Sequence, residues 1–205
     1  MADVGIIDYG MGNLRSVANA FESLDRSTRI LANPAETGMC DRIVLPGVGA
    51  FGDGMKNLRE RGWIPVLEEA VLRGGKPFIG LCLGMQLLAT TGTEHGTFDG
   101  LNWISGSVMR MQPPDATIRI PHIGWNDVEV VKTGGLYGGV TKAPTFYFVH
   151  SYAFLPDDPE VISGYANHGG RFVASVERGN LFATQYHPEK SQKDGLQVLR
   201  NFLAA

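Results

Sequence analysis

The sequence predicts an α/β fold of three layers, in which helices flank a mostly parallel central sheet and the second half of the chain adds an antiparallel β region. In the first half, strands that are apolar throughout alternate with amphipathic helices, as in parallel sheets covered on both faces. From about Trp103 onward, apolar and polar residues alternate along extended segments, as in antiparallel strands with one buried face. The length of 205 residues fits one domain, residues 1–205, with a sizeable core.

The first half is expected to alternate between strands and helices. Asn13 is expected to cap the first helix, because an asparagine side chain can accept a hydrogen bond from a backbone amide of the first turn. The residues that follow it are apolar at helical spacing up to Leu24. The predicted strands are 4–8, 28–31, 42–45 and 77–79, and the predicted helices are 14–24, 54–61, 64–73 and 85–88.

The second half is expected to be mainly β-structure before one last helix. Gly179 and Asn180 predict a hairpin between the last two strands. The last helix is expected to begin at Ser191, where Asp194 three residues later approximates a capping box. The predicted strands are 107–111, 126–130, 146–149, 161–162, 172–176 and 181–185.

A candidate nucleophile lies in the segment Gly-Leu-Cys-Leu-Gly at 80–84, between an apolar run and a helical stretch. This order predicts a strand, a sharp turn and a helix with Cys82 at the apex, because glycines two residues away on each side remove Cβ clashes. The N-terminus of the helix would favour the thiolate. The arrangement indicates covalent acyl transfer, whereas the alternative is a buried cysteine that acts as a small apolar residue.

A base for that nucleophile is expected from His187-Pro188-Glu189, directly after the last predicted strand. In an extended segment residues i and i+2 point the same way, so Glu189 can bond one imidazole nitrogen and leave the other to take the thiol proton. So short a motif is also consistent with a solvated turn.

Backbone N–H groups that would stabilise an oxyanion are expected at two places. One is the N–H of Leu83, directly after the nucleophile. The other is the glycine-rich loop Gly47-Val48-Gly49, which follows a predicted strand and whose glycines would let the Val48 peptide turn over. The alternative for this loop is a tight connection between a strand and a helix.

Composition excludes several classes of function. The net charge of −3 comes without a basic stripe, and no apolar run approaches the roughly 20 residues of a membrane span. No signal peptide is apparent. The presence of only two cysteines favours a cytoplasmic location and no disulfide, and Cys40 is expected to be a buried structural residue. A dinucleotide-binding module is not supported, because Arg15 stands where the third glycine of the fingerprint would be.

Taken together, the motifs make the chain resemble the class I (triad) glutamine amidotransferases over essentially its whole length. Within this class it is most similar to the glutaminase subunits of imidazole glycerol phosphate synthases. The motifs that carry the resemblance are Asp-Tyr-Gly-Met-Gly-Asn-Leu at 8–14, Pro-Gly-Val-Gly-Ala-Phe at 46–51, Pro-His-Ile-Gly-Trp-Asn at 121–126, Phe-Val-His-Ser-Tyr at 148–152 and His-Pro-Glu-Lys-Ser at 187–191.

The resemblance implies a role for each matched residue and no cofactor or metal. The catalytic residues would be Cys82 as nucleophile, His187 as base and then acid, and Glu189 as the group that orients the imidazole. The other implied sites are an oxyanion hole of Leu83, Gly47, Val48 and Gly49, a glutamine pocket of Gln86, Glu94, Ser151 and Tyr152, and a subunit interface of Lys190, Trp125, Tyr147 and Asn13.

For several of these residues a plainer interpretation stays open. Gln86 and Glu94, the latter expected at the end of the helix after the turn, could be solvated helix residues. Lys190 could be a surface lysine, and Trp125 could be a core aromatic.

The resemblance also implies a partner. The ammonia released from glutamine would pass to a (β/α)₈ barrel cyclase subunit, which converts a phosphoribosyl-formimino aminoimidazole carboxamide ribotide into imidazole glycerol phosphate and aminoimidazole carboxamide ribotide. This chain is too short to contain a barrel of about 250 residues as well. The alternatives are the glutaminase of another amidotransferase, a γ-glutamyl peptidase of the same fold, or an inactive scaffold subunit.

Overall fold

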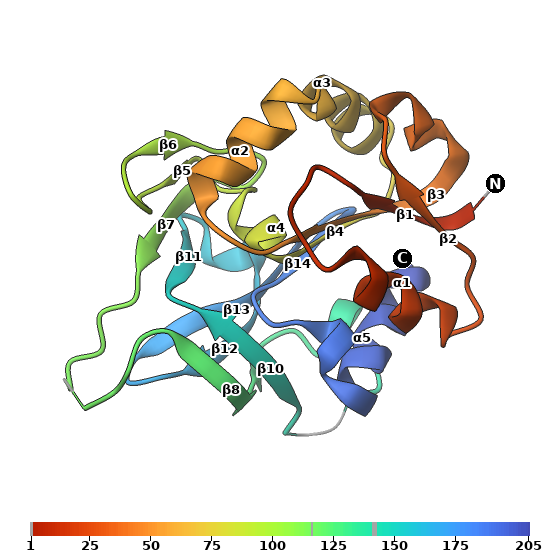
Figure 1. The fold of residues 1–205 in the computed structure, drawn as a ribbon. Helices are drawn as coiled ribbons and strands as arrows, with labels where there is room; N and C mark the ends of the chain where they lie inside the picture. Colours follow the sequence, from red (N-terminus) through yellow and green to blue (C-terminus); the bar gives the residue numbers. More distant parts are fainter. Residues whose placement is uncertain (1, 116, 141–142) are drawn as a thin grey trace.

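The computed structural model describes residues 2–115, 117–140 and 143–205, and within them an eight-stranded sheet forms the centre (Figure 1). Five neighbouring strands are parallel and the remaining three are antiparallel. In spatial order they are β2 (Thr28–Leu31), β1 (Ala2–Ile7), β3 (Cys40–Gly47), β4 (Phe78–Cys82), β14 (Leu181–Thr184), β13 (Arg171–Arg178), β12 (Ile162–Asn167) and β9 (Glu129–Val130).

Helices cover both faces of the parallel strands, which makes the three layers (Figure 1). The helices α1 (Leu14–Glu22) and α5 (Gln192–Leu203) cover one face, and α2 (Phe51–Glu60) and α3 (Trp63–Leu67) cover the other. The shorter helices are α4 (Leu83–Gln86), the 3-10 turns η1 (Pro34–Met39), η3 (Gly135–Tyr137), η4 (Pro159–Val161) and η5 (Pro188–Lys190), and the π-helical segment η2 (Glu68–Arg73).

Successive residues of each central strand pack into different layers, because side chains along a strand alternate between its faces. Ile6 and Val44 pack into the core that α1 and α5 cover, whereas Ile7 and Leu45 pack into the core beneath α2 and α3. All four are fully buried, and burial of such a side chain contributes roughly 1.5–3 kcal/mol. This double burial explains why these strands are apolar throughout.

Two smaller sheets lie beside the central one. The first is antiparallel, as the sequence predicts, and pairs β8 (His122–Asp127) with β10 (Thr145–His150). The second is mixed and has the order β11 (Tyr152–Pro156), β7 (Gly106–Arg110), β5 (Thr91–Gly92) and β6 (Phe98–Asp99), in which only β7 and β5 pair in parallel. The sequence analysis missed β5 and β6, which are too short to show a period, and β11, which lacks a strict alternation.

Several predicted elements need correction. The helix after the turn at Cys82 is a single turn, and the predicted strand 126–130 belongs to two different strands, β8 and β9. The first helix ends at Glu22, before Leu24. The capping box at Ser191 is wrong, because the Ser191 hydroxyl donates to the carbonyl oxygen of His187 at 2.6 Å and accepts from the backbone N–H of Tyr147 at 3.0 Å instead of capping α5.

The predicted helix cap and the predicted hairpin are confirmed. The side chain of Asn13 accepts a hydrogen bond from the Ser16 amide at 3.3 Å and so caps α1, and β13 and β14 form the hairpin around Gly179. Within the described residues Cys40 and Cys82 are free thiols, and Cys40 is buried. None of the described helices combines the length and apolar composition that crossing a bilayer requires.

Candidate active site

The predicted catalytic motifs meet at one edge of the central sheet, where β3, β4 and β14 end. Gly47, the last residue of β3, pairs with Cys82, the last residue of β4, and Thr184 at the end of β14 pairs with Leu81. The carboxyl ends of parallel strands in open α/β sheets are where ligands bind. Segments more than a hundred residues apart in the sequence therefore converge on one site.

Cys82 lies at a sharp turn with φ 55° and ψ −108°, a backbone conformation that non-glycine residues rarely adopt. Such a residue costs about 1–3 kcal/mol, which the surrounding structure must supply. The two glycines permit the turn, because a Cβ on Gly80 would collide with the Gly84 carbonyl and one on Gly84 would collide with the Leu45 carbonyl. The predicted elbow with the sulfur at its apex is confirmed.

The imidazole of His187 is bound to Glu189, with 2.8 Å between Nδ1 and the carboxylate Oε1. Both side chains are almost completely buried, at 5% and 3% exposed. The backbone of His187 is also fixed. Its N–H donates to the Tyr147 carbonyl at 2.9 Å, and its carbonyl oxygen accepts from the Ser191 hydroxyl. The expectation that residues i and i+2 approach each other is therefore met, and the solvated turn is not what the structure contains.

The electrostatics connect His187 to Cys82 as well as to Glu189. Burial alone would lower the pKa of His187, but interactions with the Cys82 sulfur and with the Glu189 carboxylate outweigh it and raise the pKa to about 10. The Nε2 atom is buried and forms no hydrogen bond of normal geometry with the described residues. Nε2 is thus the nitrogen left for exchange of a proton with the thiol.

A cavity of about 250 Å³ opens at the nucleophile. This volume suits a small metabolite rather than a larger ligand. It contains every residue predicted for the oxyanion hole and the glutamine pocket except Gly47, which pairs with Cys82 at its edge. The lining residues are Val48, Gly49, Cys82, Leu83, Gln86, Glu94, Val149, His150, Ser151 and Tyr152.

The side chains of Gln86 and Glu94 are held in place by hydrogen bonds within the protein. The Nε2 atom of Gln86 donates to the Tyr152 carbonyl at 3.0 Å and to the side-chain oxygen of Gln185 at 2.9 Å, so Gln86 is buried and not a solvated helix residue. Glu94 was expected at the end of the helix after Cys82, but that helix ends at Gln86. Glu94 instead follows β5 and accepts from the backbone N–H of Phe51, the first residue of α2, at 3.0 Å.

Sequence reasoning missed three further side chains around the nucleophile. Gln185 is fully buried and its Nε2 donates to the Cys82 sulfur at 3.6 Å. Tyr9 is fully buried, and burial and the nearby Cys82 raise its pKa, while its hydroxyl has no hydrogen-bond partner among the described residues. His150 lines the cavity. A polar residue within an otherwise buried run was the available signal for Gln185, which directly precedes Tyr186-His187.

The predicted interface residues lie outside this cavity. The rings of Trp125 and Tyr147 are 6.1 Å apart between centroids, and the Lys190 ammonium lies 5.8 Å from the Tyr147 centroid. Trp125 is 48% exposed, so the alternative of a core aromatic is wrong, and the neighbouring Ile123 is 60% exposed. Asn13 is also exposed, at the start of α1.

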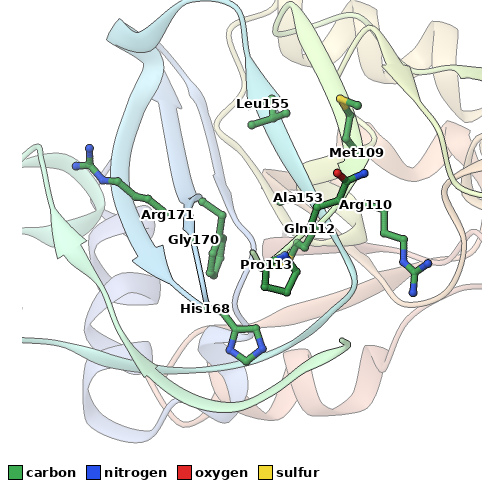
Figure 2. A pocket seen from close by; sticks show the side chains of 11 residues that line it. Met109, Arg110, Gln112, Pro113, Ala153, Leu155, His168, Gly170 and Arg171 are labelled. Carbon is green, nitrogen blue, oxygen red and sulfur yellow. The ribbon is translucent and has the colours of Figure 1, made fainter. Parts of the chain in front are cut away.

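Figure 2 shows a second cavity, of about 180 Å³. It is lined by side chains such as Met109, Gln112 and His168 and contains none of the predicted site residues. Across the described parts of the chain, no three His, Cys, Asp or Glu side chains gather in a way that could hold a metal ion. The cavity at Cys82 is the candidate active site, because the predicted nucleophile and most of the predicted binding residues line it.

Comparisons with known proteins identify the family of this chain. The family model for glutamine amidotransferase class-I matches residues 5–205. A protein of Campylobacter jejuni (strain RM1221) named imidazole glycerol phosphate synthase subunit HisH 1 is 46% identical over 98% of this chain and 98% of its own length. The subunit HisH of Geobacter sulfurreducens is 44% identical, again over 98% of each chain.

Solved structures share the fold. The structure of PurLQS from Thermotoga maritima aligns with a TM-score of 0.76 at 20% identity, covering 100% of this chain and 99% of that one. A glutamine amidotransferase aligns with a TM-score of 0.75 at 22% identity, covering 98% and 97%. The chain therefore belongs to the glutamine amidotransferase class-I family and, within it, to the HisH subunits of imidazole glycerol phosphate synthase.

Proposed function

We propose that this chain is the glutaminase subunit of imidazole glycerol phosphate synthase in histidine biosynthesis, and that it hydrolyses L-glutamine to L-glutamate and ammonia. The observation that carries the proposal is the strained turn at Cys82, which opens into a small cavity beside the buried pair of His187 and Glu189. The relatives that are 44–46% identical over nearly the full length support this assignment.

The chemistry follows from the three side chains. The sulfur of Cys82 attacks the side-chain amide carbon of glutamine, and the carbonyl oxygen becomes an oxyanion. His187, which carries a proton at neutral pH because its pKa is raised to about 10, protonates the leaving nitrogen, and ammonia departs. The γ-glutamyl thioester is then hydrolysed by a water molecule that gives its proton to His187, while Glu189 keeps the ring oriented.

Two backbone segments are in position to stabilise the oxyanion. Leu83, whose N–H is one of the donors, is the first residue of the helical turn directly after the nucleophile. The loop Gly47-Val48-Gly49 starts at the residue that pairs with Cys82, so its peptides lie beside the sulfur. The arrangement supports an oxyanion hole made of backbone groups from two adjacent strand ends.

The rest of the cavity suits the α-amino and α-carboxylate groups of the substrate. Both amide protons of Gln86 are used within the protein, so its side-chain oxygen is the atom that can accept from the substrate ammonium. Glu94 lines the same cavity and adds a carboxylate, and Ser151 and Tyr152 line it as well. These residues supply the polar groups that we expect to bind the two charged groups of the substrate.

The partner is the (β/α)₈ barrel cyclase subunit, which receives the ammonia and makes imidazole glycerol phosphate and aminoimidazole carboxamide ribotide. Trp125, Tyr147 and Lys190 form a half-exposed aromatic and cationic surface that suits a subunit interface, with Asn13 as a further contact. The cytoplasmic location and the single domain, residues 1–205, stay predictions.

The assignment is tested with the Cys82→Ala variant in complex with the barrel subunit. Synthesis that depends on glutamine is expected to disappear, whereas synthesis from added ammonia persists, because the barrel needs only the ammonia. Cys40→Ala is the matched control, since Cys40 is a free, buried cysteine in another part of the fold, and it should retain both activities. Loss of both activities in Cys82→Ala would indicate a structural role for Cys82. Glutaminase activity that does not rise with the barrel and its ribotide would indicate another partner.

A further inference from the structure

The side chain of Gln185 joins the nucleophile to the wall of the substrate cavity. Gln185 directly follows β14, and it is fully buried. Its Oε1 accepts from the Gln86 amide at 2.9 Å, and its Nε2 lies 3.6 Å from the Cys82 sulfur in hydrogen-bond geometry. A buried amide is stable only when its donors and acceptors have partners, so the contact with sulfur is part of how Gln185 is accommodated.

The direction of these hydrogen bonds is fixed by a backbone carbonyl. The Tyr152 carbonyl oxygen can only accept, so the atom of Gln86 that faces it at 3.0 Å must be the NH₂ group. That same NH₂ group also faces Gln185, so the atom of Gln185 that meets it must be the oxygen. The remaining end of Gln185, its NH₂ group, is therefore the end that faces the sulfur.

The Tyr152 carbonyl is held by a second series of hydrogen bonds. It lies 2.8 Å from Nδ1 of His150, which must donate, and this leaves Nε2 of His150 to accept from His122 Nδ1 at 3.0 Å. Nε2 of His122 then accepts from the amide of Asn126 at 3.2 Å. The Tyr152 carbonyl oxygen thus accepts from His150 and from Gln86, and its hydrogen bond with Gln86 sets the orientation of the Gln185 amide.

We propose that Gln185 is a positioning residue for the Cys82 sulfur, whose amide donates to the thiolate and keeps it directed at the substrate carbon. The inference rests on the proposed function, in which Cys82 is the nucleophile. The titratable groups that act on the sulfur are His187 and Tyr9, with Glu94 and His150 on the wall of the same cavity. The amide has a separate role, because it donates to the sulfur without titrating, whereas His187 must also give its proton to the leaving nitrogen.

A purely structural role is the competing explanation, since Gln185 also satisfies Gln86. Two variants separate the explanations. Gln185→Glu has the same shape and keeps an oxygen for the Gln86 amide, but it puts a negative oxygen where the donor faces the sulfur. Gln185→Met removes donor and acceptor at similar volume. Gln112→Glu is the matched control, because it makes the same change of charge at an exposed residue of the second cavity.

The experiment measures three quantities on the full chain. The first is the rate at which iodoacetamide alkylates Cys82 as a function of pH, followed on the peptide that contains it. The second is the separate kcat and KM for glutamine in complex with the barrel subunit and its ribotide, and the third is the cooperativity of thermal unfolding. If Gln185→Met does not unfold cooperatively, the isosteric Gln185→Glu decides the question.

For Gln185→Glu we expect the pH midpoint of alkylation to rise by about one unit and kcat to fall at least about tenfold, with KM within about twofold. Gln185→Met should also raise the pH midpoint and lower kcat, but by smaller amounts. Gln112→Glu should match the unaltered chain. Unchanged alkylation profiles and kcat values in cooperatively folded variants would overturn the proposal, as would a loss confined to melting temperature and KM. A failure of the proposed function is distinguishable, because the unaltered complex would then not hydrolyse glutamine at all.

Discussion

The sheet edge at Cys82 and the two-stranded sheet of β8 and β10 are built in opposite ways. At the edge, the nucleophile is 6% exposed and is held in a strained conformation by close backbone approaches. On this small sheet, Ile123 and Trp125 leave about half or more of their surfaces exposed. The difference matches the two roles that we propose, because the predicted catalytic groups lie together at the sheet edge, whereas the exposed apolar side chains of the small sheet suit contact with a partner.

The largest expected effect comes from breaking the buried pair at the edge. Glu189→Gln removes the negative charge that holds His187 in one tautomer and supports its protonated form. Glutaminase kcat should fall by about 10³–10⁴-fold. Steady-state kinetics of the complex measure this, and Glu129→Gln, at an exposed ion pair with Arg171, is the matched control. A Glu189→Gln enzyme with nearly full activity would mean that Glu189 does not orient the base.

The steric origin of the elbow is tested with Gly84→Ala. The added Cβ would collide with the Leu45 carbonyl, which belongs to the rigid sheet and cannot move aside cheaply. We expect a loss of about 3 kcal/mol or more in the free energy of unfolding, together with loss of glutaminase activity. Urea unfolding measures the first quantity. Gly38→Ala, where no described heavy atom lies within 4 Å of the new Cβ, should change the stability by less than about 0.5 kcal/mol.

The two regions should also differ in their response to pH. Burial lowers the pKa of His122 to about 4 and that of His150 to about 3, below the usual value near 6.5. Because the unfolded chain binds these protons more readily, the stability that they contribute is present above about pH 6.5 and is lost as the pH falls toward 3–4. The loss is at most about 1.4 kcal/mol per pH unit for each histidine.

His187 has the opposite sign, because its pKa is raised to about 10 in spite of burial, by Cys82 and Glu189. Its contribution is present below about pH 6.5 and is lost as the pH rises through 10. Urea unfolding between pH 4 and pH 10 checks both sides, and His150→Asn should flatten only the acid side. A slope on the acid side that is the same in His150→Asn would show that other groups cause it.

The smallest expected effect on the isolated chain is at the small sheet of β8 and β10. Trp125→Ala should lower the stability of the free chain by about 1 kcal/mol, because only the buried half of the side chain contributes. It should weaken binding of the barrel subunit by about ten- to a hundredfold, as for an aromatic anchor. Isothermal titration measures this, with Met109→Ala at the second cavity as the control. Equal affinity of Trp125→Ala and the unaltered chain would place the interface elsewhere.

Sequence reasoning reached the parallel half of the fold because its signals are local. The apolar strands, the Asn13 cap and the glycines around Cys82 each act within a few residues, and each is found in the structure. The same reasoning failed at Ser191, whose hydroxyl makes a contact that depends on the position of Tyr147 on β10. Which of several possible partners a polar side chain takes is set by residues far away in the sequence.

The site shows the same limit. The pair of His187 and Glu189 could be predicted from its spacing, because both residues belong to one extended segment. Gln185 and Tyr9 could not, since the approach of each to Cys82 depends on how β1, β4 and β14 pair in the sheet. Glu94 was assigned to the correct cavity through resemblance but to the wrong element, because the helix after Cys82 is only one turn long.

The most direct test of the account is to look for the covalent intermediate. The complex with the barrel subunit and its ribotide is mixed with glutamine, quenched in acid during turnover, and the peptide that contains Cys82 is weighed by mass spectrometry. We expect a γ-glutamyl group on Cys82, and no such group when Cys82→Ala is treated in the same way. Continued production of glutamate with that peptide unmodified throughout, or with the γ-glutamyl group on another residue, would contradict the account.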